Sequence, residues 1–378
     1  MRKIALVFLS VALCVGCTEK PVLRVTVENP LPTERYGEIV EVPWELLEEG
    51  LENAVPDEIL VCDSTGQELP SQVVYRNEKS PQALIFQLTL GGGARGCYLV
   101  KKGIRTAYVQ KVHGRLVPER KDDFAWENEK VAYRMYGPAL EATGEISNGL
   151  DVWMKCKDEL MLEEWYKNGD YHRNHGKGMD GYAVGRTLGG GAMAPLADGK
   201  LVLGNNFTRV EWMEEGPLRI SFCLCYAPYQ VGGAEVTERR VITLDAGTRF
   251  NRIEETYEGL PVEGEVAAGI VLRPEEGERL CDTVSGLLGY WEPLNRNNGD
   301  DNGHTAIGLF FPNRMERIVE KDGHLLAVGK YGKTPFVYYA GSGWSLGGIK
   351  DAEDWFGILR TEKIKLENPL KIKIETVG

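Results

Sequence analysis

The sequence predicts an all-β protein, a large antiparallel β-sandwich with few short helices. Short apolar stretches of strand length recur along the chain, separated by turn residues such as Ser64-Thr65-Gly66. Residues 218–226 alternate strictly between an apolar face and a mixed face, as a half-buried strand does. Asp245-Ala246-Gly247 separates two more such stretches with hairpin chemistry. With 378 residues and 43% hydrophobic content, the chain can bury a sizeable core.

The elements follow in order from these patterns. One early helix is expected at 43–54, because Pro43 is tolerated in a first turn and Trp44, Leu47 and Leu51 recur at helical spacing. A second helix is expected at 351–359. The expected strands are 23–30, 58–62, 72–75, 83–90, 97–101, 131–136, 150–154, 218–226, 236–244, 250–257, 267–272, 306–311, 325–329 and 336–340.

The N-terminus has the pattern of a secretory signal. Arg2 and Lys3 precede a short apolar run that ends at Gly16-Cys17, so residues 1–16 are expected to be a lipoprotein signal peptide and Cys17 the lipidated residue. A plain secreted protein is the alternative. As a lipoprotein, the mature chain would be tethered to a membrane only through its lipid, in the periplasm or on the outer-membrane surface. A charged stretch from Pro118 suggests two parts, 17–118 and 119–378.

Charge and cysteine content exclude several classes of protein. The net charge of −12 makes a nucleic-acid partner unexpected. Six cysteines follow Cys17 without a C-x-x-C pair, which argues against a zinc ribbon or a thioredoxin-type site. Cys223 and Cys225 are expected on one face of a strand, too far apart for a relaxed disulfide. Most of the six are interpreted as buried free thiols.

Residues 165–191 are expected to form a long functional loop. Recurrent glycines disfavour both helix and strand, and four aromatic residues argue against disorder. A glycine-rich surface insertion is the alternative. Its chemically useful side chains are Tyr171, His172, Arg173, His175, Lys177, Asp180, Tyr182 and Arg186.

Four stretches resemble the DUF4861 family, found among polysaccharide-utilisation lipoproteins of Bacteroidetes. They are Trp126-Glu127-Asn128 with Tyr133 to Ala139, the segment from Tyr171 to Gly189, Gly216-Pro217-Leu218-Arg219, and Tyr338 to Ser345. The resemblance covers roughly residues 23–360. It implies a galactose-mutarotase-like sandwich, or supersandwich, acting on plant or algal glycans that contain uronic acids. Asn174 departs from the family pattern, where an aspartate is expected, so a role needing a carboxylate there is in doubt.

The loop's side chains suit elimination beside a uronate carboxylate better than hydrolysis. Elimination needs a cation for the carboxylate, a base for the proton alpha to it, and an acid for the leaving oxygen. Hydrolysis needs two carboxylates flanking the bond, and the loop supplies only Asp170 and Asp180, with Glu163 and Glu164 upstream. The expected catalytic residues are therefore Tyr171, His172, His175 and Arg186.

The same histidines allow a metal hypothesis. His172 and His175, joined by Asp180 or His304, would hold a divalent ion such as zinc or calcium, although two histidines three residues apart are weak evidence. No cofactor is otherwise indicated. A bound cation would take the place of an arginine as the partner of the substrate carboxylate.

Tryptophans are candidate platforms for the apolar faces of sugars, and Trp344 is preferred because glycines flank it. Trp165 and Trp291 are further candidates. The expected substrate-binding residues are Trp126, Arg173, Asp180, Tyr182 and Trp344.

The sequence thus predicts a carbohydrate-active lyase or dehydratase for uronate-containing oligosaccharides. The alternatives are a glycoside hydrolase on the same scaffold and a surface glycan-binding lipoprotein without turnover.

Overall fold

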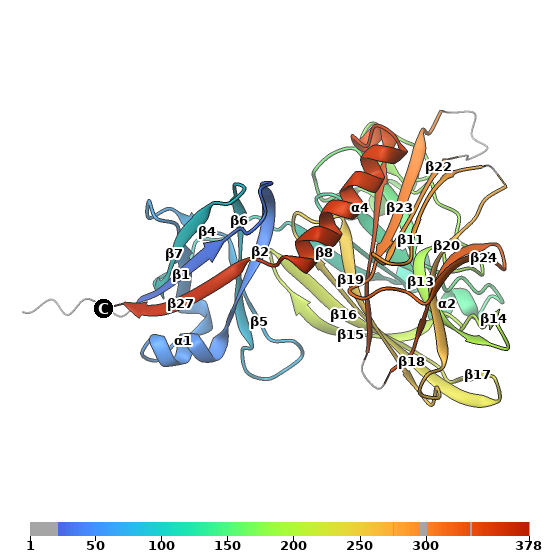
Figure 1. The fold of residues 1–378 in the computed structure, drawn as a ribbon, viewed down its shortest axis with the longest axis horizontal. Helices are drawn as coiled ribbons and strands as arrows, with labels where there is room; N and C mark the ends of the chain where they lie inside the picture. Colours follow the sequence, from blue (N-terminus) through green and yellow to red (C-terminus); the bar gives the residue numbers. More distant parts are fainter. Residues whose placement is uncertain (1–21, 275, 295–300, 333–334, 378) are drawn as a thin grey trace, which may run out of the picture.

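The computed structural model describes residues 22–377 except 275, 295–300 and 333–334. The expected signal peptide and the lipidation site Cys17 lie outside the described residues. The all-β expectation is confirmed: antiparallel sheets dominate, and the helices are few (Figure 1). Within the described chain, no helix combines the length and the apolar character that a membrane crossing requires.

The N-terminal part is a small sandwich of two sheets, with strand orders β27-β1-β7-β3-β4 and β2-β6-β5. Their facing sides bury a separate apolar cluster that includes Val25, Leu47 and Phe86. The helix α1 begins directly after Pro43 and buries Trp44 and Leu47. The elements are β1 (Val22–Glu28), β2 (Arg35–Pro43), α1 (Trp44–Gly50), a 3₁₀ turn (Pro56–Glu58), β3 (Ile59–Cys62), β4 (Glu68–Leu69), β5 (Ser71–Val74), β6 (Ala83–Leu90) and β7 (Arg95–Lys102).

Strand pairing crosses the division that the charged stretch suggested. The last strand, β27 (Lys371–Val377), returns to the N-terminal sandwich and pairs with β1 along its whole length, from Val22 opposite Val377 to Glu28 opposite Lys371 (Figure 1). Residues 118 and 119 lie in a 3₁₀ turn (Pro118–Arg120) that connects β8 (Val112–Val117) to β9 (Asp123–Asn128), two strands of one hairpin. Whether 17–118 and 119–378 fold as separate units stays a prediction.

The larger part is a second sandwich with a nine-stranded sheet as one layer. Its strand order is β15-β16-β18-β19-β26-β23-β22-β21, with β17 paired to β18. The strands are β15 (Phe207–Glu215), β16 (Arg219–Tyr226), β17 (Tyr229–Val231), β18 (Ala234–Asp245), β19 (Phe250–Glu258), β21 (Glu278–Asp282), β22 (Leu287–Pro293), β23 (His304–Phe310) and β26 (Phe336–Trp344).

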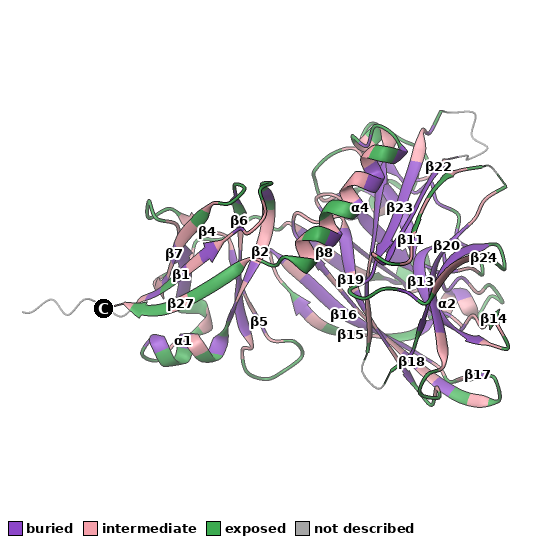
Figure 2. Ribbon diagram, in the orientation of Figure 1, coloured by how far each residue is buried: buried purple, intermediate pink, exposed green. Residues whose placement is uncertain are grey.

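Two five-stranded sheets form the other layer, with orders β12-β11-β10-β9-β8 and β14-β13-β20-β25-β24. A bridge between Leu150 and Gly189 links them. The principal core lies between this layer and the nine-stranded sheet, where Figure 2 shows mostly buried strands. The remaining strands are β10 (Ala132–Met135), β11 (Asp151–Lys155), β12 (Gly178–Met179), β13 (Gly190–Ala197), β14 (Lys200–Leu201), β20 (Glu265–Val271), β24 (Arg317–Lys321) and β25 (His324–Lys330).

Helix α4 (Ala352–Glu367) covers the outer face of the nine-stranded sheet. Asp351 caps its first turn by accepting a hydrogen bond from the Asp354 backbone N–H. Trp355, Phe356 and Leu359 pack on Phe250 and Phe310 of the sheet. This helix continues eight residues beyond its expected end. There Lys363 donates to the Phe311 and Pro312 carbonyls, and Leu366 packs against the same apolar cluster. Two shorter helical pieces are α2 (Pro138–Glu141) and the 3₁₀ turn Ser345–Gly347.

The expected loop 165–191 is only partly a loop. Its first four residues belong to α3 (Leu162–Asn168), its middle contributes the short strand β12, and its last two begin β13. The helix forms because Glu127 accepts hydrogen bonds from the backbone N–H groups of Met161 and Leu162, at 2.7 and 2.8 Å, at its first turn. This anchor lies 34 residues away in sequence, so local patterns did not indicate it.

Candidate functional site

The site is built on the outer face of the sheet β12-β11-β10-β9-β8. Arg134 on β10 lies opposite Asp151 on β11, and Asp123 begins β9 on the same side. Helix α3 and the loop after it cover this face and bury a small apolar cluster that includes Trp153 and Trp165. The loop is held close because Gly178 has a positive φ of 139° and its Cα faces the Met154 carbonyl, where any side chain would collide.

Arg134 is the buried centre of the site. Its Nε donates to Asp151 Oδ2 at 2.8 Å and a terminal nitrogen to Asp180 Oδ2 at 3.0 Å, while Asp123 Oδ2 lies 3.9 Å from Nε. The guanidinium carbon also lies 5.0 Å from the ring centroid of Trp153. One cation thus faces three carboxyl groups whose side chains are at most 3% exposed.

Burial and neighbouring charges shift the pKa values of the residues in this cluster to different extents. Burial alone disfavours the charge of Arg134, but Asp151 and Asp180 hold its pKa well above the usual value. Burial raises the pKa of Asp123 to about 6 despite the nearby Arg134. Burial also raises the pKa of Asp151, and Arg134 offsets only part of that effect. Asp123 and Asp151 therefore titrate closer to neutrality than surface aspartates do.

His172 connects the buried cluster to solvent. Its Nδ1 lies 3.1 Å from Asp180 Oδ2 and 3.3 Å from the Asp180 backbone oxygen, and its side chain is 44% exposed. With Nδ1 protonated and donating to the carboxylate, Nε2 carries the lone pair. Asp180 thereby fixes the tautomer and the orientation of an accessible imidazole.

Tyr171 packs between the rings of Trp153 and His172. Its ring stacks on Trp153 with centroids 5.0 Å apart, contacts the His172 ring at 4.6 Å, and lies under Arg120. Only 5% of the residue is exposed. Burial raises the pKa of Tyr171, more than Arg120 and Arg134 lower it. Burial therefore outweighs the two nearby cations, and Tyr171 keeps its proton at neutral pH.

His175 and the arginines Arg173 and Arg186 are exposed, whereas Arg134 is buried. His175 is exposed, and its Nε2 lies 3.1 Å from Asp170 Oδ2, so the two histidines face different carboxylates. Arg173 and Arg186 are both exposed. The catalytic roles of Tyr171, His172, His175 and Arg186 stay predictions, of which the geometry best accommodates that of His172.

Four of the five expected substrate-binding residues are buried too deeply for that role: Trp126, Asp180, Tyr182 and Trp344. Trp126 is 0% exposed and donates its indole N–H to Asn251, and Trp344 is 1% exposed and donates to the Asn302 carbonyl. Both are core residues, and Trp165 and Trp291 are also buried. Asp180 is fully buried and contacts His172 and Arg134. These expectations are corrected by burial.

Tyr182, another expected substrate-binding residue, is also buried, and it contacts Arg273. It is 2% exposed, and Arg273 lies over its ring at 4.6 Å. Arg273 Nε also lies 3.8 Å from Glu292, which is buried on β22. Burial and then Glu292 raise the pKa of Tyr182, so its hydroxyl is un-ionised at neutral pH.

Among the described residues, His172 and His175 do not belong to any group of three side chains with metal-ligand spacing. Among the described residues, the side chains that group with metal-ligand spacing are Glu211, Cys223 and Cys225, far from the loop in sequence. His304, proposed as a partner, stacks on Trp291 with centroids 5.2 Å apart. A zinc or calcium ion at His172 and His175 stays a prediction.

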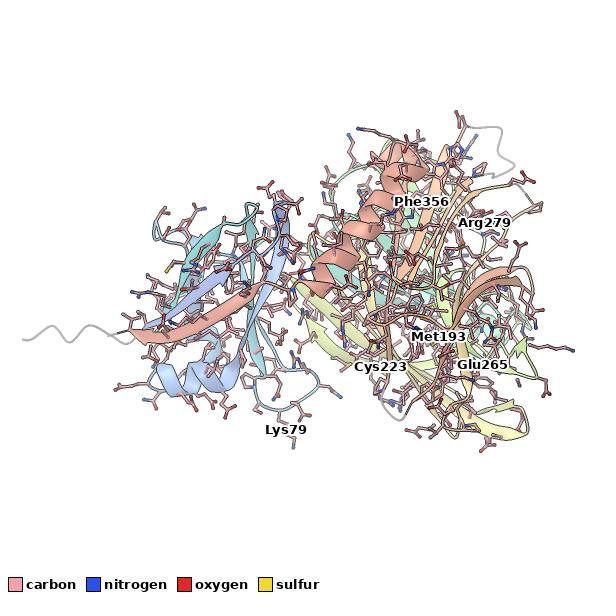
Figure 3. The ribbon with its side chains drawn as sticks, viewed as in Figure 1. Lys79, Met193, Cys223, Glu265, Arg279 and Phe356 are labelled. Atoms are coloured by element: carbon pink, nitrogen blue, oxygen red, sulfur yellow. The ribbon has the colours of Figure 1, made fainter. Side chains whose placement is uncertain are left out.

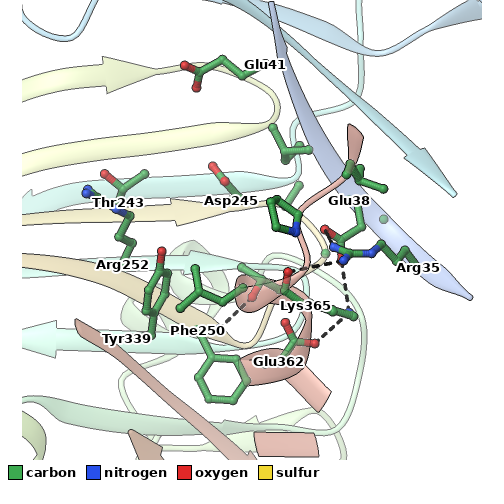
Figure 4. A pocket seen from close by; sticks show the side chains of 18 of the residues that line it. Arg35, Glu38, Glu41, Thr243, Asp245, Phe250, Arg252, Tyr339, Glu362 and Lys365 are labelled. Atoms are coloured by element: carbon green, nitrogen blue, oxygen red, sulfur yellow. Dashed lines mark hydrogen bonds and ion pairs between the residues drawn. The ribbon is translucent and has the colours of Figure 1, made fainter. Parts of the chain in front are cut away.

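Two well-formed cavities lie elsewhere. One, of about 490 Å³, lies between β2, α4 and the outer face of the nine-stranded sheet (Figure 4). Its charges already pair with one another: Arg219 with Asp245 and Glu41, and Lys365 with Glu38 and Glu362. The other, of about 690 Å³, is lined by residues that include Lys111 and Asp158. None of the expected catalytic residues lines either cavity.

Sequence reasoning missed the buried members of the site. Arg134, Asp151, Asp123 and Trp153 were not expected to take part, although Arg134 stood in one of the quoted family motifs. The available signal was a charged residue next to apolar ones in a short strand. Arg134 stands among Ala132, Tyr133 and Met135, and Asp151 directly precedes Val152 and Trp153. Such charges are rarely buried unless they are paired.

A family model described as "Domain of unknown function (DUF4861)" matches residues 27–372, which is nearly the whole described chain. The chain belongs to the DUF4861 family. The DUF4861 chain is also 29% identical over 373 residues to "Uncharacterized protein P7" of Formosa agariphila, with 93% of each chain covered.

Solved structures similar to this DUF4861 protein come from sugar-processing enzymes. An alpha-mannosidase from Enterococcus faecalis V583 superposes with a TM-score of 0.51 at 10% identity, covering 94% of this chain and 46% of that one. A glycosyl hydrolase family 38 protein from Enterococcus faecalis gives 0.51 at 11%, with 94% and 47% covered. The chain spans about half the length of these proteins, and at this identity the likeness shows the fold alone.

Proposed function

We propose that this DUF4861 protein is a carbohydrate-active enzyme that cleaves uronate-containing oligosaccharides by β-elimination, with His172 transferring the proton. The observation that supports it is the accessible imidazole held by a buried carboxylate: Nδ1 of His172 lies 3.1 Å from Asp180 Oδ2. When Nδ1 donates to that carboxylate, Nε2 carries the lone pair that can accept a proton. We also propose that the mature protein is a lipoprotein of the periplasm or outer-membrane surface.

In the proposed step, His172 Nε2 removes the proton alpha to the uronate carboxylate. The electron pair of that C–H bond forms a carbon–carbon double bond, and the bond to the leaving oxygen breaks. The imidazolium, stabilised by Asp180, returns its proton to that oxygen. Exposed Arg173 or Arg186 would hold the substrate carboxylate and stabilise the charge that develops on it.

Burial favours elimination over hydrolysis at this position. Hydrolysis requires two carboxyl groups that reach the scissile bond from opposite sides. The three carboxyl groups around Arg134 are at most 3% exposed, and their oxygens face the guanidinium. His172 is the exposed proton carrier attached to that cluster.

Hydrolysis is the second candidate function, and one observation favours it. Asp123, with a pKa raised to about 6, resembles a carboxyl group prepared to act as a general acid. The similar solved structures are of glycoside-processing proteins, which is compatible with this reading. It requires a rearrangement that opens the carboxyl cluster to substrate.

The experiment incubates the protein with pectic, ulvan-type and arabinogalactan oligosaccharides. Elimination gives new ultraviolet absorbance of an unsaturated uronate without uptake of water, as mass spectrometry shows. New reducing ends with uptake of water and no absorbance would replace elimination by hydrolysis. Binding without either product would make the protein a glycan-binding lipoprotein.

Two variants separate catalysis from folding. His172→Ala should lower kcat by about 10²- to 10⁴-fold, the usual contribution of general acid–base catalysis. His113→Ala is the matched control, because His113 also pairs with a carboxylate, Glu163, at 3.1 Å, and lies outside the loop. Equal activity of His172→Ala and the wild type would remove His172 from the mechanism.

A further inference from the structure

A second cluster of reactive side chains lies on the opposite layer, at the edge of the nine-stranded sheet. β16 alternates, so Phe222 and Leu224 enter the principal core while Cys223 and Cys225 face the other side. Figure 3 labels Cys223 within this sheet. The site described above uses none of these residues.

Strand register places three charged side chains beside the two thiols. On the edge strand β15, Glu211 is opposite Cys223 and Arg209 is opposite Cys225. On β18, Arg239 is opposite Cys225. The Sγ atoms of Cys223 and Cys225 are 4.0 Å apart, and one carboxylate oxygen of Glu211 lies within 4.8 Å of both.

We propose that Cys223, Cys225 and Glu211 form a zinc site that fastens the edge strand β15 to β16. Zinc–sulfur bonds of about 2.3 Å at a tetrahedral angle place two sulfurs about 3.8 Å apart. The two thiols are separated by 4.0 Å, so they need almost no movement to become two such ligands. Glu211 supplies an oxygen, and a water completes four ligands.

The separation also distinguishes zinc from other outcomes. A disulfide needs its sulfurs about 2.05 Å apart and strains two residues that are two apart on one strand. Hard cations such as calcium prefer six to eight oxygen ligands, and the described cluster offers one carboxylate. Two soft sulfurs at tetrahedral spacing, with one carboxylate oxygen within 4.8 Å of both, fit zinc.

Charge balance permits the exchange of protons for metal. Arg209 and Arg239 each place a guanidinium nitrogen 3.4 Å from Cys225 Sγ, and Arg239 also pairs with Glu211 at 2.7 Å. Two arginines and one carboxylate give the metal-free cluster a charge of about +1. Replacing two thiol protons by one divalent cation leaves that charge unchanged. The arginines then stabilise the thiolates.

The two thiols are shielded from solvent, whereas Arg209 on one side of the cluster is exposed. Cys223 and Cys225 are 1% and 6% exposed, whereas the side chain of Arg209 is 59% exposed and can move aside. Cysteine binds zinc as the thiolate, whereas an ordinary free thiol carries its proton at neutral pH. Zinc binding should therefore release protons.

The test uses the full, reduced chain with zinc alone as the probe. Equilibrium dialysis with elemental analysis should give one zinc per chain with proton release. Cys223→Ser and Cys225→Ser should each weaken binding by at least about 100-fold, since even supporting residues of metal sites contribute 10- to 100-fold. Cobalt should show a thiolate-to-metal charge-transfer band that weakens in each single variant and is lost in the Cys223→Ser/Cys225→Ser double variant.

Controls separate this site from the other cysteines and from the histidine loop. Cys281→Ser, at an exposed cysteine, and a His172→Ala/His175→Ala double variant should bind zinc as the wild type does. Undiminished zinc binding by the Cys223→Ser/Cys225→Ser double variant would overturn the proposal. So would a cobalt complex without the charge-transfer band.

A second measurement keeps the test valid if the serine variants do not fold. In the wild type, saturating zinc should protect Cys223 and Cys225 from alkylation, mapped by mass spectrometry under mild denaturant, while Cys281 stays reactive. Zinc should also raise the Tm of the wild type, because it binds the folded state. Equal alkylation of Cys223 and Cys225 with and without zinc would contradict the site.

Discussion

Nδ1 of His172 lies 3.1 Å from Oδ2 of Asp180, the oxygen that Arg134 also contacts. An exposed imidazole is thus connected, through one buried atom, to the buried cation at the centre of the site. Asp180 is fully buried, so its part in any reaction is to position and stabilise His172 rather than to touch substrate.

Asp180→Asn should lower kcat by about 10²-fold or more with little change in KM, because the amide no longer fixes the tautomer or stabilises the imidazolium. The measurement is steady-state elimination across a pH series. A merely structural role would instead lower Tm and leave the shape of the pH profile unchanged. Asp170→Asn, at the exposed partner of His175, is the matched control.

Arg134→Leu should destabilise the folded protein by roughly 3–5 kcal/mol, because it leaves the carboxyl groups of Asp151 and Asp180 buried without their cation. Urea unfolding measures the loss. Arg120→Ala is the control: Arg120 is exposed and lies over Tyr171, so its removal should cost about 1 kcal/mol or less. Equal losses in the two variants would contradict the buried-centre description.

Asp123 should make the protein less stable as the pH rises. Its pKa is about 6 in the folded state, against 3.8 for the unperturbed group, so between these values the folded state binds more protons. The contribution of Asp123 is fully present below pH 3.8 and is lost as the pH rises through 6, by roughly 3 kcal/mol.

Asp123→Asn should flatten this part of the curve of unfolding free energy against pH, since an amide does not ionise. Denaturant midpoints at closely spaced pH values provide the measurement. A wild-type curve and a variant curve of identical slope between pH 4 and about 6 would show that Asp123 ionises normally in the folded protein.

Trp344→Ala should destabilise the protein by about 3–5 kcal/mol, the usual cost of removing a buried tryptophan. It also removes the 2.7 Å hydrogen bond to the Asn302 carbonyl. Trp212→Ala, at 41% exposure, should cost less. Thermal unfolding without glycan checks both. A Trp344 variant of normal stability with weakened glycan binding would restore the sugar-platform hypothesis.

The family motifs illustrate how much the sequence could indicate about residue roles. Trp126-Glu127-Asn128 reads as a candidate binding motif, yet all three side chains hold the framework. Trp126 bonds Asn251, Glu127 anchors α3 and pairs with Lys155, and Asn128 donates to the carbonyls of Asp245 and Thr248. The partners are distant along the chain, so the pattern marks these residues without giving their function.

The strands most clearly predicted were those with strong local periodicity, such as β16, β18 and β19. Strands without it were missed, including β8, where His113, Gly114 and Arg115 interrupt the apolar pattern, and β15, whose register shifts near Arg209 and Glu214. Their pairing depends on neighbouring strands that offer hydrogen-bond partners. The pattern within a single segment does not contain that information.

By itself the sequence determined the all-β class, the family, most strands and the loop that carries His172, because side-chain periodicity and turn chemistry act over a few residues. Only the tertiary structure decided which polar groups meet. It joined His172 to Asp180 and Arg134, buried Trp126 and Trp344, and returned β27 to β1. These outcomes depend on strand order and burial, which bring residues far apart in the chain into one low-dielectric environment.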